Sequence, residues 1–180
     1  MPELIVHKFG GSCLRDKGDI DRIGQLVSSF NAKPVIVVSA LWGVTDRLMR
    51  AANDPYYAGR LVEDLRRQHL RFSPGIETSI HYDKFTRILK GISSDLVILS
   101  TEPSTQAARN RILAAGERLS AIVVAHRLQH FGLDAHPVGA EDIGLRLKGK
   151  TAAKIVDLEN SKLTLSRENI EGIPILTGWV

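Results

Sequence analysis

The chain has 180 residues, of which 43% are hydrophobic and 24% charged, the composition of a soluble globular protein with one well-cored domain. A net charge of +4, spread along the chain, and only 6% aromatic residues argue against a nucleic-acid partner. The single cysteine, Cys13, excludes an intrachain disulfide, and neither a membrane span of roughly 18 apolar residues nor a signal peptide is evident. We therefore expect a cytoplasmic protein without a membrane partner.

The first 53 residues predict two strand–loop–helix units. Residues 3–9 form a short apolar run that ends at Gly10-Gly11, and apolar residues then recur with helical spacing in 19–30. Residues 34–40 form a nearly all-apolar run typical of a strand covered on both faces, and 47–53 are helical in character. Repeated units of this kind predict an α/β protein with parallel strands.

The remainder of the chain predicts helices followed by two strands. Three helices are expected within 56–72, 79–99 and 104–131, separated by Pro and Gly signals. Short strands are expected within 132–140 and at 172–180. Because the chain stops inside an apolar strand pattern, we expect it to be a piece cut from a longer protein.

A lysine and a bare loop follow the first predicted strand. Gly10 and Gly11 remove the side chains that would keep an anion from the backbone, while Lys8 supplies a positive charge. Ser12 is expected in the N-cap region of the next helix, where backbone N–H groups can bind phosphate. The pattern is neither a Walker nor a Rossmann motif, so a simple turn remains an alternative to an anion site.

Two further stretches could complete a ligand site. Ser39 and Thr45 follow the second strand, at the end where ligands gather in open α/β sheets, although Thr45 could simply be an N-cap. Gly116 interrupts a helical pattern and so marks a close approach or a helix start. Glu117 beside it could then face an ammonium group, or else form an ordinary surface pair with Arg118.

Together these stretches resemble one enzyme family. The segments "KFGGS", "VVSALWGVTD", "GERLSA" and "GIPILTGWV" match, in order and approximate spacing, the motifs of aspartate kinases in the amino-acid kinase superfamily. The resemblance spans essentially the whole chain. It implies an α/β amino-acid kinase (carbamate kinase-like) fold, in which helices flank a parallel-rich central sheet.

The resemblance also implies a reaction and its residues. ATP, with Mg²⁺, would phosphorylate the side-chain carboxylate of L-aspartate, the first step of lysine, threonine and methionine biosynthesis. Lys8 would stabilise the transferring phosphoryl group, and Phe9 to Ser12 would contribute to phosphate binding, mainly through backbone N–H groups. Ser39, Thr45 and Glu117 would bind aspartate, and no residue is assigned to a metal. A homo-oligomer is expected.

The chain also departs from the family pattern. Ser12-Cys13 replaces Thr-Ser, so a thiol is expected beside a helix N-terminus, where it would be sensitive to oxidation unless it is a small buried cysteine. Trp179 stands where Phe is usual. The nucleotide-binding segments and ACT regulatory domains of the family are absent, so residues 1–180 are expected to be an amino-acid-binding lobe that is inactive alone. A non-catalytic paralog, or a relative with a different carboxylate or carbamate substrate, remains possible.

Overall fold

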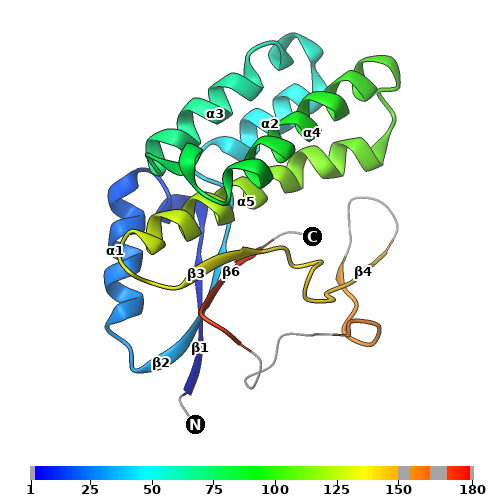
Figure 1. The fold of residues 1–180 in the computed structure, drawn as a ribbon. Coiled ribbons are helices and arrows are strands. Elements are labelled where there is room, and N and C mark those ends of the chain that lie inside the picture. Colours follow the sequence, from blue (N-terminus) through cyan, green and yellow to red (C-terminus); the bar gives the residue numbers. More distant parts are fainter. Residues whose placement is uncertain (1–2, 150–154, 163–169, 179–180) are drawn as a thin grey trace.

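The computed structural model describes residues 3–149, 155–162 and 170–178. Its centre is a four-stranded sheet in the order β1 (Glu3–Phe9), β2 (Ala32–Val38), β6 (Ile173–Thr177), β3 (Ala135–Val138). Every neighbouring pair in this sheet is parallel, which confirms the predicted architecture (Figure 1). All four strands therefore present their carboxyl ends at one edge of the sheet.

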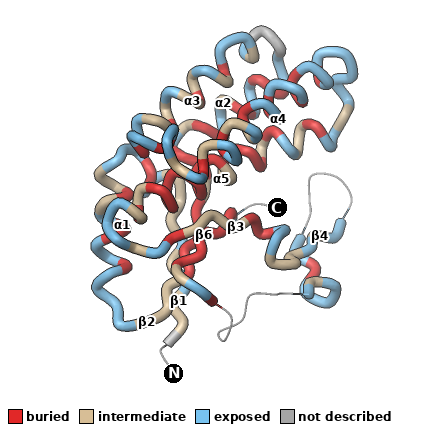
Figure 2. The backbone as a smooth tube through the Cα atoms, viewed as in Figure 1, coloured by how far each residue is buried: buried red, intermediate tan, exposed pale blue. Residues whose placement is uncertain are grey.

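The helices lie on one face of this sheet. The elements are α1 (Lys17–Ser28), α2 (Val44–Asn53), α3 (Leu61–Phe72), α4 (Tyr82–Thr101) and α5 (Gln106–Gln129). Helix α5 crosses the sheet and contacts β2, β3 and β6, while α1 to α4 pack around it (Figure 1). It is accordingly the most completely buried helix (Figure 2).

Alternation along the strands divides the core between the two faces. Ile36 and Val38 of β2 join Ile175 of β6 in the large cluster beneath α5. Val35 of the same strand and Leu176 of β6 belong to a smaller cluster with Ile170. Successive side chains of a strand point to opposite faces, so β2 contributes apolar side chains to a cluster on each face of the sheet.

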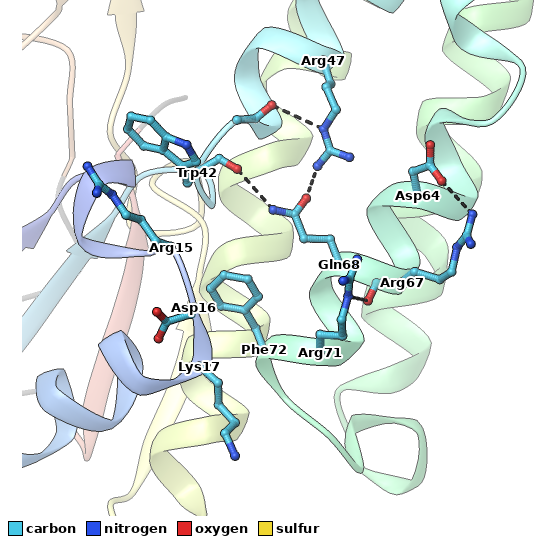
Figure 3. A pocket seen from close by; sticks show the side chains of 11 residues that line it. Arg15, Asp16, Lys17, Trp42, Arg47, Asp64, Arg67, Gln68, Arg71 and Phe72 are labelled. Atoms are coloured by element: carbon cyan, nitrogen blue, oxygen red, sulfur yellow. Dashed lines mark hydrogen bonds and ion pairs between the residues drawn. The ribbon is translucent and has the colours of Figure 1, made fainter.

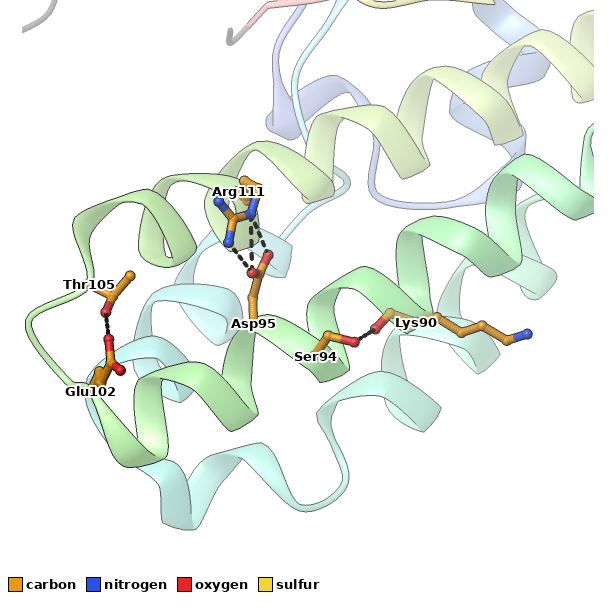
Figure 4. Close-up of polar contacts among 6 residues, drawn as sticks. All are labelled: Lys90, Ser94, Asp95, Glu102, Thr105 and Arg111. Atoms are coloured by element: carbon orange, nitrogen blue, oxygen red, sulfur yellow. Dashed lines mark hydrogen bonds and ion pairs between the residues drawn. The ribbon is translucent and has the colours of Figure 1, made fainter.

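Helices α4 and α5 are joined by an ion pair between Asp95 and Arg111 (Figure 4). Arg111 Nε donates to both carboxylate oxygens of Asp95 at 3.1 Å. The carboxylate is buried, with Asp95 only 7% exposed, whereas the guanidinium remains in contact with solvent. The pairing raises the pKa of Arg111 and aligns two long helices that otherwise meet through apolar side chains.

The structure corrects three local predictions about helix starts. Ser12 does not cap α1: it lies in a 3-10 turn (Gly11–Cys13), and Asp16 caps α1 through a reciprocal capping box with Asp19. Thr45 is not the N-cap of α2, because Gly43, at φ 73°, holds that position. Gly116 does not start a helix, since α5 already begins at Gln106.

Other element boundaries shift by a few residues from the predictions. Helix α1 begins two residues earlier than expected, β2 spans 32–38 instead of 34–40, and α2 begins at Val44. A short antiparallel pair, β4 (Leu147–Lys148) and β5 (Ile155–Val156), was not predicted. The predicted last strand ends at Thr177 in the described part of the chain, and residues 179 and 180 lie outside it. Within the described ranges, no helix is long and apolar enough to cross a membrane.

Candidate functional site

Lys8 and Ser39 meet at the carboxyl ends of β1 and β2. Lys8 Nζ donates a hydrogen bond of 3.2 Å to Ser39 Oγ. The strands are in parallel register, with Phe9 opposite Val38, and Ser39 N–H donates to the Phe9 carbonyl at 3.0 Å. The backbone pairing thus extends one residue past β2 and holds both polar side chains at the same edge, where Lys8 is exposed.

The glycine loop lies directly beside this pair. A Cβ on Gly10 would lie 3.4 Å from Lys8 Nζ, and a Cβ on Gly11 would lie 3.1 Å from the Ala40 carbonyl oxygen. Gly10 has φ −77°, an ordinary backbone conformation, so the tight approach in this loop is that of Gly11 to the Ala40 carbonyl. The turn closes through the Cys13 N–H, which donates to the Gly10 carbonyl at 2.8 Å. Ser12, within this turn, is exposed.

Glu117 reaches the same edge of the sheet from α5. A Cβ on Gly178 would lie 3.4 Å from Glu117 Oε2 and 3.4 Å from the Val38 carbonyl oxygen. Gly178 N–H itself donates to that Val38 carbonyl at 3.0 Å, so the backbones after β2 and β6 run together here. Glu117 Oε2 is buried although the residue as a whole is half-buried. The carboxylate therefore lies at the ends of the two central strands.

Gly116 allows α5 to approach the loop that follows β2. A Cβ at this position would lie 3.0 Å from Leu48 Cδ1 and 3.1 Å from both Ala40 Cβ and Val44 Cγ1. The predicted close approach is therefore present, in the middle of the helix. Because Glu117 is the next residue, this tight packing brings its carboxylate to the strand ends.

Thr45 is separate from these contacts. It is the second residue of α2 and is exposed. No hydrogen bond joins its hydroxyl to Lys8, Ser39 or Glu117 in the part of the chain that the structure describes. The structure thus brings three predicted side chains to one edge, and leaves Thr45 on the helix that starts there.

Sequence reasoning missed a polar cluster at the ends of β3 and β6. A cavity of about 240 Å³ is lined there by residues that include Arg118, Glu141 and Thr177. Arg118 forms an ion pair of 2.5 Å with Glu141, and the buried Thr177 hydroxyl accepts a hydrogen bond of 3.0 Å from Ala140 N–H. Part of the signal was present, because Thr177 lies in the last predicted strand, at 172–180, and Arg118 follows Glu117.

Cys13 is exposed, which excludes the buried alternative. It ends the 3-10 turn, and α1 begins only at Lys17, so the predicted position beside the helix N-terminus is wrong. Trp179 lies outside the described residues. Within those residues, no group of three or more His, Cys, Asp or Glu side chains could hold a metal ion.

Comparison with known proteins agrees with this architecture. The Amino acid kinase family matches residues 3–180. Aspartokinase 2, chloroplastic, and Aspartokinase 3, chloroplastic, both of Arabidopsis thaliana, are 27% and 28% identical over 97% of this chain. The chain spans 34% of the length of each of these relatives, about one third.

Solved structures show the same fold. E. coli aspartokinase III in complex with aspartate and ADP (R-state) superposes with a TM-score of 0.82, at 21% identity, over 98% of this chain and 40% of that one. Its complex with lysine and aspartate (T-state) gives 0.80 at 20% identity, with coverage of 97% and 40%. Aspartate kinase from Clostridium acetobutylicum gives 0.62 at 16% identity, with coverage of 89% and 35%. With a parallel sheet, flanking helices and a family match over nearly its whole length, this chain belongs to the amino acid kinase family.

Proposed function

We propose that residues 1–180 are the amino-acid-binding lobe of an aspartate kinase, which transfers the γ-phosphoryl group of ATP to the side-chain carboxylate of L-aspartate. The observation that carries this proposal is the contact of Lys8 Nζ with Ser39 Oγ, 3.2 Å long, beside a loop stripped of side chains. Similarity to two plant aspartokinases supports the choice of substrate.

In this proposal the phosphate end of the site is built from the first strand and its loop. The Lys8 ammonium neutralises charge on the transferring phosphoryl group, and the backbone of Phe9, Gly10, Gly11 and Ser12 cradles the phosphate oxygens. Phosphoryl transfer depends on positioning and charge neutralisation, so a mobile cation over exposed backbone suits it. Gly10 and Gly11 carry no side chain that would keep phosphate oxygens away from the backbone.

The amino-acid end of the site uses groups from two other elements. Glu117 would bind the α-ammonium group of aspartate, because its carboxylate lies at the ends of the central strands. Ser39 and Thr45 would donate hydrogen bonds to the carboxylates of the substrate. Thr45 is the weakest of these assignments, since its exposed hydroxyl would need the ligand to extend over the start of α2.

In this proposal ATP is a co-substrate and Mg²⁺ is bound to it. Mg²⁺ bound to ATP would add charge neutralisation at the phosphates, and in kinases it is held by one or two carboxylates together with the phosphates. We assign none of the described residues to the metal. We propose that the chain alone does not form acyl phosphate, because it spans only 34% of the length of its curated relatives.

Calorimetry of the full-length protein with aspartate, glutamate and N-acetylglutamate tests the proposal. We expect the protein to bind aspartate tightly and to bind neither glutamate nor N-acetylglutamate tightly. In a separate assay with ATP and aspartate, we expect it to form an acyl phosphate that hydroxylamine traps. Preference for another carboxylate would indicate a different member of the family, and binding without turnover would indicate a non-catalytic paralog. Cytoplasmic location and homo-oligomeric state stay predictions, and both curated relatives are chloroplastic by name.

A further inference from the structure

A cationic groove lies outside the site that Lys8 lines. It has a volume of about 750 Å³, within the range of small-molecule sites. It is formed by the loop after β1 with the start of α1, the loop after β2 with the start of α2, and helix α3. Its lining includes five cationic side chains, Arg15, Lys17, Arg47, Arg67 and Arg71, against two carboxylates, Asp16 and Asp64 (Figure 3).

The two carboxylates are already engaged. Asp64 pairs with Arg67 at 2.7 Å, and the Asp16 carboxylate accepts a hydrogen bond of 3.1 Å from Asp19 N–H as the cap of α1. The other four cations, Arg15, Lys17, Arg47 and Arg71, form no ion pair with a carboxylate within the described ranges. The hydrogen bond leaves the negative charge of Asp16 in place, and Arg127 and Lys17 both lie close enough to Asp21 to lower the pKa of that carboxyl. With five cationic side chains against two carboxylates, the lining of the groove carries a net charge of +3.

Several of these groups are held in place by the loop after β2. The Arg15 guanidinium lies 4.7 Å from the ring centroid of Trp42, whose side chain is 56% exposed. Gln68 Nε2 donates to the Trp42 carbonyl at 3.2 Å, and Gln68 Oε1 accepts from Arg47 Nη2 (Figure 3). Arg47 Nε also donates to the Gly43 carbonyl at 3.4 Å. Holding cations in this way lowers the entropy lost when an anion binds.

We propose that this groove binds a small organic anion that carries at least two carboxylate or phosphate groups. Guanidinium groups match the geometry of both oxyanions, and a multiply charged ligand would relieve the repulsion among four neighbouring cations. None of Lys8, Gly10, Gly11 or Ser39 lines the groove. The inference thus goes beyond the proposed kinase function. It concerns a separate site, to which the loop after β2 contributes Trp42 and Gly43.

Calorimetric titration of the 180-residue chain tests the proposal, with citrate as the polycarboxylate and pyrophosphate as the phosphate, at constant ionic strength set by KCl. We expect the wild type to bind at least one probe, and Arg15→Gln/Arg71→Gln to bind it at least tenfold more weakly. Both positions are exposed, so circular dichroism should show an unchanged fold. Tighter binding of citrate would indicate a polycarboxylate as the ligand of the groove, and tighter binding of pyrophosphate would indicate a phosphorylated ligand.

Two controls distinguish this groove from general charge and from the phosphate loop. Lys90→Gln/Arg146→Gln removes the same charge from exposed positions elsewhere and should bind within twofold of wild type. Lys8→Ala should also retain binding. Absence of binding to both probes, an equal loss in the Lys90/Arg146 variant, or loss in Lys8→Ala would each overturn the proposal, without bearing on aspartate kinase activity.

Discussion

The Lys8 ammonium and the Ser39 hydroxyl come from neighbouring parallel strands and meet at 3.2 Å. Lys8 is the second-last residue of β1, and Ser39 directly follows β2; the register of the two strands places Lys8 opposite Val37 and Phe9 opposite Val38. The backbone hydrogen bonds of the sheet therefore fix the relative positions of the two residues at one edge of the sheet, as the proposed phosphate and carboxylate site requires.

Replacing Lys8 with alanine should remove most of the proposed transferase activity. We expect kcat of the full-length protein to fall by about 10² to 10³, the usual loss when one charge-stabilising group is removed from a transition state. Acyl phosphate trapped with hydroxylamine provides the measurement. Lys90→Ala, an exposed lysine of α4, should leave kcat unchanged. An unchanged kcat in Lys8→Ala would refute the assigned role.

Glu117→Gln should weaken aspartate binding more than it slows turnover. The change keeps the size of the side chain but removes the charge that would bind the α-ammonium group, and hydrogen bonds to charged groups contribute about 1.5–3 kcal/mol. We expect the aspartate KM to rise by about 10- to 100-fold. Glu63→Gln on the exposed surface of α3 is the matched control. Equal KM values for the two variants would exclude Glu117 from the substrate site.

Gly116→Ala should destabilise the protein, although alanine favours a helix. The new Cβ would lie 3.0 Å from Leu48 Cδ1 and 3.1 Å from Ala40 Cβ, and overpacking a core costs about 1–3 kcal/mol. Gly91→Ala in α4 is the control, because nothing lies within 4 Å of its Cβ position, and it should stabilise by about 0.5–1 kcal/mol. Urea denaturation would measure both, and similar values would show that α5 can shift without cost.

Stability should fall as the pH falls below about 6.5. Burial is the main cause that lowers the pKa of His69 and of His126 to about 4, and the nearby His130 and His81 contribute at His126. Between these pKa values and the ordinary value of 6.5, the unfolded chain binds protons that the folded protein excludes. Acidification therefore favours unfolding, by at most about 1.4 kcal/mol per pH unit for each histidine.

Urea denaturation at pH 7 and pH 5 would measure this dependence. His126→Gln should reduce the difference between the two values, whereas exposed His130→Gln should retain most of it. The Ser73 hydroxyl, 2.6 Å from His126 Nδ1, gives the glutamine amide a hydrogen-bonding partner. An undiminished difference in His126→Gln would mean that other groups carry the pH dependence.

Much of the fold could be predicted from local patterns. The strand predicted for residues 3–9 agrees with β1, and the three middle helices occur where helical spacing and Pro-Gly breaks indicated them. Helix starts were less predictable, because a helix begins where a side chain accepts hydrogen bonds from the backbone N–H groups of its first turn. Asp16 does so for α1, whereas Ser12 lies in a separate turn.

The sequence by itself determined the order of the central strands and the five long helices, the α/β class and the motifs "KFGGS" and "GERLSA", because these depend on residues close together in the chain. Only the tertiary structure decided that Glu117 reaches the ends of β2 and β6 through the packing of Gly116 against Ala40 and Val44. It alone also decided that Arg15, Arg47 and Arg71 share one groove. These side chains are far apart in the chain, and the register of the sheet and the packing of the helices set their distances.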